Sequence, residues 1–120
     1  MTMEECYSKF GGNYKDAMNR MYSEERVIRY AFNFLDTTDD EMLEKAHDEK
    51  DNSKMFVFSH RIKGMAANLG FSDLQKSASQ LTEMYRGGKI PDTSDSDKVY
   101  SEVESEYKKI KENITDFKNA

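Results

Sequence analysis

The strongest constraint on the fold lies in the last quarter of the chain, where apolar residues recur in alternating steps of three and four. The series comprises Tyr100, Val103, Tyr107, Ile110, Ile114 and Phe117. This spacing places its members on one stripe of an α-helix and is typical of the seam along which bundled helices pack. The only proline, Pro91, precedes the series, so no residue interrupts a helix from about residue 96 to 118.

Helical spacing divides the rest of the chain into further helices. We expect two short helices within residues 1–22, a pair of helices within residues 23–50, and longer helices over 54–69 and 72–86. No alternation of period two indicates a strand. The sequence therefore predicts one all-α domain over residues 1–120. It would be an antiparallel four-helix bundle, residues 23–118, with short additional N-terminal helices before it.

Capping residues support several of these boundaries. Gly70 and the Gly87-Gly88 pair are suited to end the helices before them. Three pairs have the spacing of a capping box, in which a hydroxyl side chain precedes Glu or Gln by three residues: Thr2 with Glu5, Thr38 with Glu41, and Ser72 with Gln75.

The charge and the cysteine content exclude several classes of function. The net charge is −5, which argues against nucleic acid and anionic membranes as partners. No long apolar run and no secretory leader are visible, so we expect a cytoplasmic protein. Cys6 is the only cysteine and fits a core position. Two histidines and one cysteine form no close ligand cluster, so we expect no metal site.

The predicted helix over residues 54–69 carries a histidine on the side away from its core face. On a helical wheel the core arc contains Met55, Phe58, Ile62, Met65, Ala66 and Leu69. His60 lies nearly opposite the centre of that arc, and Lys63, Gly64 and Ala67 continue the same outward stripe. A helix with a filled core face therefore presents an imidazole to solvent.

Each residue of this stripe has a chemical use. An imidazole is mostly neutral at neutral pH and can act as a nucleophile. The charge of Lys63 disfavours a second positive charge on His60 and would attract phosphoryl oxygens. Gly64 costs about 1 kcal/mol relative to alanine inside a helix, which indicates that something large approaches the imidazole there. The small Ala67 keeps the same path open.

Side chains around His60 predict a docking surface. Phe56 and Val57 point to the same outward side and would form an apolar patch. A partner with an acidic pocket would suit the basic residues that we expect around it, which are Lys54, Arg61, Lys63, Lys76 and Arg86.

The segment His60–Gly70 resembles the H-x-x-K-G-x-x-x-x-x-G signature of histidine phosphotransfer (HPt) domains, and Phe71–Leu74 also fits that family. The resemblance implies that His60 accepts a phosphoryl group from a receiver-domain aspartate or a hybrid histidine kinase and passes it to a response-regulator aspartate. It implies that Lys63 stabilises the phosphoryl group and that Gly64 gives access. Binding residues would be Phe56, Val57, Arg61, Ala67, Thr82 and Arg86.

The same resemblance implies a monomeric phosphorelay intermediate rather than an enzyme, with partners limited to receiver domains and a histidine kinase. It would need no cofactor, because the receiver supplies Mg²⁺. Some family members place a glutamine twenty-two residues after the histidine to hydrogen-bond the imidazole. Thr82 stands at that position here, so Thr82, Gln80 or neither orients His60.

Two alternatives stay open. A non-catalytic adaptor could bind receiver domains through the same face without accepting a phosphoryl group. The chain could also be the phosphotransfer module of a kinase, although no phosphate-binding glycine loop is present and phosphorylation from ATP alone should fail. We expect His47 to be solvated, and likewise the Glu102, Glu104 and Glu106 side chains.

Overall fold

A computed structural model describes residues 1–120 and contains helices but no strands, which confirms the predicted all-α class. The α-helices are α1 (Met3–Lys9), α2 (Tyr14–Met21), α3 (Glu24–Phe34), α4 (Asp39–Asp48), α5 (Asn52–Leu69), α6 (Ser72–Tyr85) and α7 (Thr93–Asn119), and a single 3-10 turn, η1 (Arg86–Gly88), follows α6.

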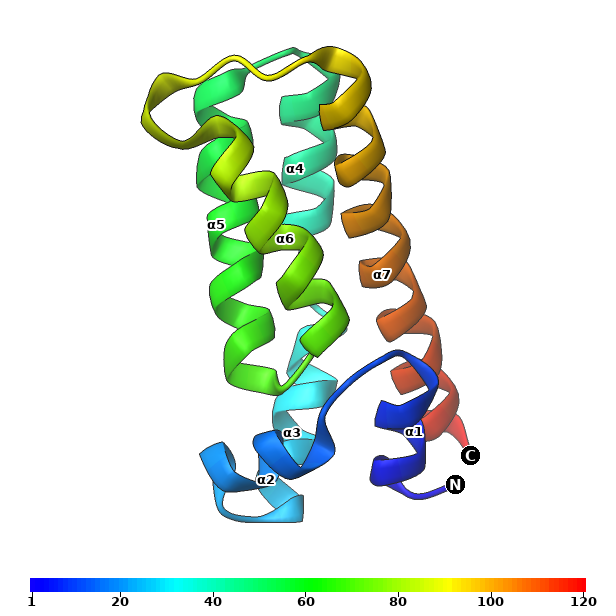
Figure 1. Cartoon of the computed structure of the whole chain (residues 1–120). Helices are drawn as coiled ribbons and strands as arrows, with labels where there is room; N and C mark the ends of the chain where they lie inside the picture. Colours follow the sequence, from blue (N-terminus) through cyan, green and yellow to red (C-terminus); the bar gives the residue numbers. More distant parts are fainter.

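Helices α4, α5, α6 and α7 form the antiparallel bundle, and α1, α2 and α3 lie at the end where both termini meet (Figure 1). The pair of helices predicted within residues 23–50 is present as α3 and α4, but only α4 is one of the four bundle helices, which corrects the expected place of α3. Helix α3 continues beyond the end of α4 and packs against α7 and α5. With 27 residues, α7 is about 40 Å long and can support both α4 and α3.

An aromatic cluster joins the N-terminal helices to the bundle. Phe10 and Phe34 both pack against Phe71, and Phe34 also packs against Tyr107. The ring centroids of these pairs are 4.7 to 5.2 Å apart, and all four side chains are fully buried. The Tyr7 hydroxyl donates to the carbonyl oxygen of Leu69 at 2.6 Å. Since Phe71 directly follows the α5–α6 turn, this cluster fixes the end of the helix that carries His60.

Gly70 allows the turn between α5 and α6. Its φ of 72° is left-handed, and a Cβ atom there would lie 2.7 Å from the carbonyl oxygen of Asn13. The Gly70 carbonyl also accepts the Asn13 backbone N–H at 2.7 Å. Only glycine fits both the conformation and the close approach of α2.

One predicted capping box forms and two do not. Thr2 and Glu5 make the reciprocal bonds of the box. Thr38 makes no side-chain cap, and α6 is preceded by Phe71, which leaves Ser72 inside the first turn. Phe71 is buried directly after Gly70, so α6 begins at the next residue. Ser72 is then the first residue of the helix and not its cap.

Aspartates cap the two longest helices of the bundle. Asp51 caps α5, which begins at Asn52 rather than at residue 54. Asp92 caps α7, which begins at Thr93 rather than at about residue 96. Side-chain oxygens of aspartate accept the free N–H groups of a first turn, so both helices gain a few residues.

The structure corrects the expectation that His47 is solvated. Its ring stacks on Tyr100 at 3.8 Å between centroids and 3° between planes. Its Nε2 atom lies 2.8 Å from Asp97 Oδ1. These contacts join α4 to α7, so His47 has a structural environment of its own.

The predicted solvated face of α7 is also wrong for two glutamates. Glu104 Oε1 and Glu106 Oε2 are buried without a hydrogen-bond partner, whereas Glu102 is exposed. Burial, followed by the charges of Asp40 and Glu44, raises the pKa of Glu104 to about 7. The carboxylates near Glu104 belong to α4, whereas Glu106 lies on the side of α7 that faces Asp73 of α6.

Candidate functional site

The buried face and the exposed face of helix α5 are those predicted from the sequence. Met55, Ile62, Ala66 and Leu69 are buried, and Phe58 and Met65 are partly buried against the core. His60 is exposed in the middle of the helix. Because α4 and α6 both pack against α5, the bundle covers the other sides of the helix and leaves the His60 side free.

An aromatic ring one turn away lies against the imidazole. Phe56 and His60 are stacked, with centroids 5.8 Å apart and an angle of 13° between the rings. The guanidinium of Arg86 lies 5.3 Å from the Phe56 centroid, a cation–π contact. Phe56 is partly buried, whereas Val57 beside it is 47% exposed. Both are therefore near His60, and Val57 offers apolar surface to a partner.

Glu83 is a residue of this site that the sequence analysis missed. Arg86 binds it through Nε at 3.0 Å to both carboxylate oxygens and through Nη2 at 2.9 Å to Oε1. The hydrogen bond from Arg86, together with the charges of Arg86 and Lys63, lowers the pKa of Glu83. The three-residue spacing of Glu83 and Arg86 on a helix was the available signal.

Lys63 supplies the free positive charge near His60. It lies one turn after His60 on the same face, is partly exposed, and forms no ion pair within 4.0 Å. Its long side chain can therefore move toward an anion that reaches the imidazole.

The predicted basic surface is weaker than expected, because several of its residues are paired with carboxylates. Arg61 Nη2 lies 3.3 Å from Asp39 Oδ1, Arg86 is held by Glu83, and Lys54 Nζ lies 4.0 Å from Asp51 Oδ2. Lys76, like Lys63, forms no ion pair.

Gly64 is exposed, and no packing contact requires its lack of a side chain. A Cβ atom there would have no heavy atom within 4 Å outside its own helix backbone. In contrast to Gly70, its conformation is one that alanine adopts readily. The bundle itself therefore has no need of this glycine. Ala67, one turn further along, is partly exposed.

Thr82 does not lie on the binding surface, which corrects that expectation. It is fully buried, and its hydroxyl donates to Ser59 Oγ at 3.1 Å and lies 2.8 Å from the carbonyl oxygen of Ala78. Ser59 in turn donates to the carbonyl oxygen of Met55 at 2.6 Å. Thr82 thus ties α6 to α5 directly beneath His60.

Gln80 does not orient the imidazole either, because no hydrogen bond joins Gln80 to His60. It lines a polar pocket with Glu102 and Glu106 of α7, and α7 packs on the other side of α6. Neither Thr82 nor Gln80 therefore hydrogen-bonds to the imidazole, and its stacked neighbour is Phe56.

Comparison with known proteins identifies the family. A family model described as Hpt domain matches residues 33–116, which include α4 to α6 and nearly all of α7. No curated protein and no solved structure gave a significant match. None of the helices has the length and apolar character needed to cross a membrane.

Proteins with this domain take part in histidine phosphotransfer in phosphorelays, with receiver domains and histidine kinases as partners. The match covers well over half of the chain, the helices form the expected bundle, and the signature segment lies within it. The chain therefore belongs to the Hpt domain family.

Proposed function

We propose that His60 accepts a phosphoryl group from the aspartate of a receiver domain, in a response regulator or a hybrid kinase, and passes it to the aspartate of another. One observation carries this proposal. An exposed imidazole lies in mid-helix beside an unpaired lysine and a glycine that the fold does not need.

The chemistry requires only a nucleophile, alignment and charge neutralisation. A ring nitrogen of His60 attacks the phosphorus of the aspartyl phosphate, an N–P bond forms, and the P–O bond to the carboxylate breaks. The reverse reaction with a second aspartate restores the imidazole. Phosphoryl transfer of this kind depends mainly on positioning and electrostatic stabilisation. Lys63 would neutralise the phosphoryl oxygens during both steps.

The partner supplies the rest of the site. The receiver domain brings the aspartate and Mg²⁺, and this chain brings no cofactor. Phe56, Val57 and Ala67 offer apolar contact around the imidazole, while Arg61 and Arg86 can exchange their present carboxylates for those of a partner. We expect no phosphorylation of the chain from ATP alone.

Incubation with a phosphorylated receiver domain tests the proposal. The chain should acquire label that is lost in acid and stable in base, and the label should disappear in His60→Gln. His47→Gln is the matched control, because it removes the other histidine, and it should label normally. Label that persists in His60→Gln would refute the assignment.

A non-catalytic adaptor is the second candidate, because the Thr82 hydroxyl bonds Ser59 or Ala78 and not the His60 ring. The same assay separates the two functions when binding is measured beside it. Receiver binding without any phosphohistidine would favour the adaptor, whereas transfer through His60 excludes it.

A further inference from the structure

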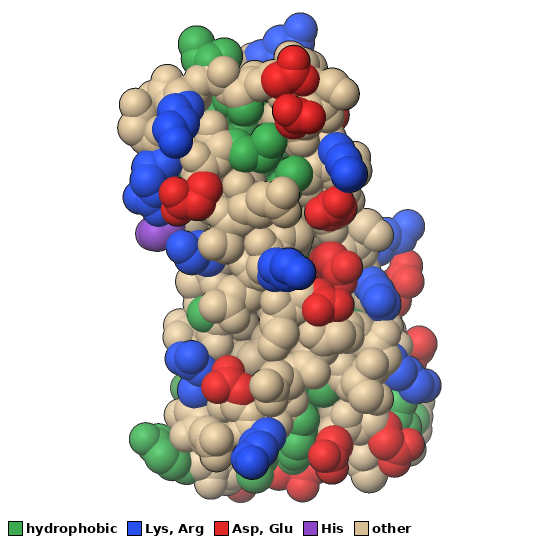
Figure 2. Space-filling model, viewed as in Figure 1, with side chains coloured by type: hydrophobic (Ala, Val, Ile, Leu, Met, Phe, Trp, Pro, Cys, Tyr) green, Lys and Arg blue, Asp and Glu red, His purple; other side chains and the backbone are tan.

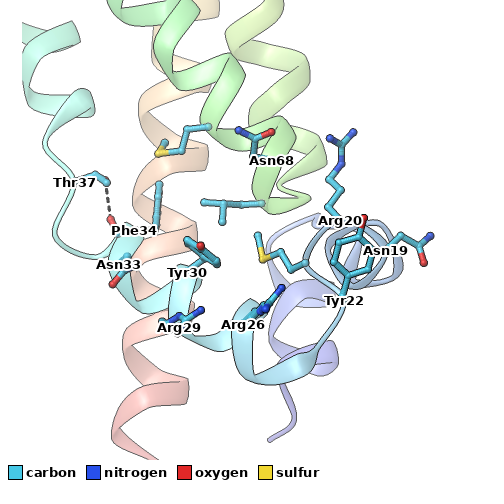
Figure 3. Close-up of a pocket in the computed structure, with 13 residues that line it drawn as sticks. Asn19, Arg20, Tyr22, Arg26, Arg29, Tyr30, Asn33, Phe34, Thr37 and Asn68 are labelled. Atoms are coloured by element: carbon cyan, nitrogen blue, oxygen red, sulfur yellow. Dashed lines mark hydrogen bonds between the residues drawn. The ribbon is translucent and has the colours of Figure 1, made fainter.

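A wide groove of about 1120 Å³ lies between α2, α3 and the C-terminal end of α5 (Figure 3). Its floor is apolar and is formed by Met21, Phe34, Met65 and Leu69. Polar and aromatic side chains surround this floor, namely Asn19, Arg20, Tyr22, Arg26, Arg29, Tyr30, Asn33, Thr37 and Asn68. Methionine side chains on such a floor can adapt to the shape of a bound segment.

The charge of this groove differs from that of the rest of the molecule. The chain has 23 acidic and 18 basic residues, and both signs are interspersed over the face in Figure 2, yet the groove is lined by three arginines and no carboxylate. Arg20 is paired with Asp16 at 3.1 Å, whereas Arg26 and Arg29 form no ion pair. Free guanidinium groups therefore lie here, while those near His60 already hold carboxylates.

Exposed tyrosines accompany these arginines. Tyr22 is 81% exposed and has a left-handed φ of 69°, and Tyr30 is 44% exposed with Arg29 5.5 Å from its ring centroid. Tyrosine and arginine around an apolar floor are enriched in protein interfaces. This composition favours a protein segment with both apolar and acidic side chains as the occupant.

The groove is continuous with the site through α5. Asn68 lines the groove and follows His60 by eight residues, which places it about 12 Å along the helix axis and about 80° around it. A domain of about 100 residues has a radius of gyration of about 13 Å, so one partner can reach both places.

We propose that this groove is a second docking site for the receiver protein that meets His60, and that it binds an acidic amphipathic segment of that partner. The inference rests on the proposed function for the identity of the partner. Contacts to Arg26 and Arg29 would strengthen and orient the complex without touching the reacting atoms. They would contribute to association and not to the chemical step.

Charge reversal in the groove tests the proposal. Phosphotransfer from the phosphorylated receiver domain is compared between the wild-type chain and the Arg26→Glu/Arg29→Glu variant, at several ionic strengths. We expect the KM for the receiver to rise roughly tenfold at low salt, with a smaller difference at high salt and an unchanged rate at saturation. The matched control is Lys98→Glu/Lys108→Glu on α7, which changes the net charge equally and should leave KM unchanged.

Equilibrium binding of the same receiver, with thermal unfolding as a check on the fold, separates the two hypotheses. If the groove variant has the same KM, salt dependence and receiver affinity as the wild-type chain, the second docking site is overturned. Phosphotransfer to His60 is unaffected by that outcome. Groove-dependent binding without label on the wild-type chain would overturn the proposed function alone. No binding of the receiver at all would overturn both.

Discussion

Substitution of Gly64 by alanine should stabilise the protein and impair its function. Alanine is more favourable than glycine inside a helix by about 1 kcal/mol. Nothing in the structure opposes that gain, because a Cβ atom at Gly64 has no neighbour within 4 Å. The free energy of unfolding should therefore rise by about 1 kcal/mol, which raises Tm by about 4 °C in a domain of this size.

The same methyl group would stand one turn from His60, on the side from which an aspartyl phosphate approaches. A reacting phosphorus atom has to come within about 3–3.5 Å of the imidazole nitrogen, so a small obstruction there is costly. We expect Gly64→Ala to lower the rate of phosphotransfer roughly tenfold or more, since 1.4 kcal/mol in the barrier has that effect. Gly64→Gln, with a longer side chain, should lower it further.

Thermal unfolding and a rapid-quench transfer assay on the same preparations measure both effects. Ser105→Ala is the control, because Ser105 is exposed on α7 and the change raises helix propensity away from α5. It should stabilise the chain without slowing transfer. A Gly64→Ala protein that is more stable and transfers at the wild-type rate would refute the idea that this glycine gives access to His60.

Three further substitutions have distinct expected outcomes. Lys63→Ala should slow transfer roughly 10–100-fold without changing Tm, because the Lys63 charge is available to the phosphoryl group and no ion pair is lost. Transfer at the wild-type rate would exclude Lys63 from the site. Thr82→Val should lower the free energy of unfolding in urea by about 1 kcal/mol and leave the transfer rate little changed, since the Thr82 hydroxyl bonds Ser59 and not His60. A severe loss of transfer would contradict this. Glu104→Gln should stabilise the fold at pH 8 and have little effect at pH 4. The pKa of Glu104 is about 7 in the folded chain and 4.5 in the unfolded chain, so the folded chain loses stability as the pH rises between these values. An equal gain in stability at pH 8 and pH 4 would contradict this assignment.

Sequence periodicity was enough to predict α5 and the exposure of His60. The core arc of this helix is unambiguous, because six of its apolar residues, Met55, Phe58, Ile62, Met65, Ala66 and Leu69, share one side and set its orientation in the bundle. The exposed positions of Val57 and Gly64 follow from that orientation alone. Local pattern therefore predicts which side of a well-formed amphipathic helix meets solvent.

Contacts between helices were beyond this reasoning. The position of Thr82 depends on the register between α5 and α6, and one step of register decides whether its hydroxyl faces Ser59 or solvent. His47 meets Asp97 across 50 residues of sequence, and Arg61 meets Asp39 across a turn. Pairings of this kind arise from packing, and no spacing rule within one helix predicts them.

The central claim is that one of two histidines is chemically available. His60 is exposed and bonded to no carboxylate, while His47 is stacked on Tyr100 and bound to Asp97. Fragmentation mass spectrometry of the phosphorylated chain, kept at alkaline pH, locates the phosphoryl group directly. The account predicts that it lies on the peptide that contains His60. A phosphoryl group on His47, or on no histidine, would contradict it.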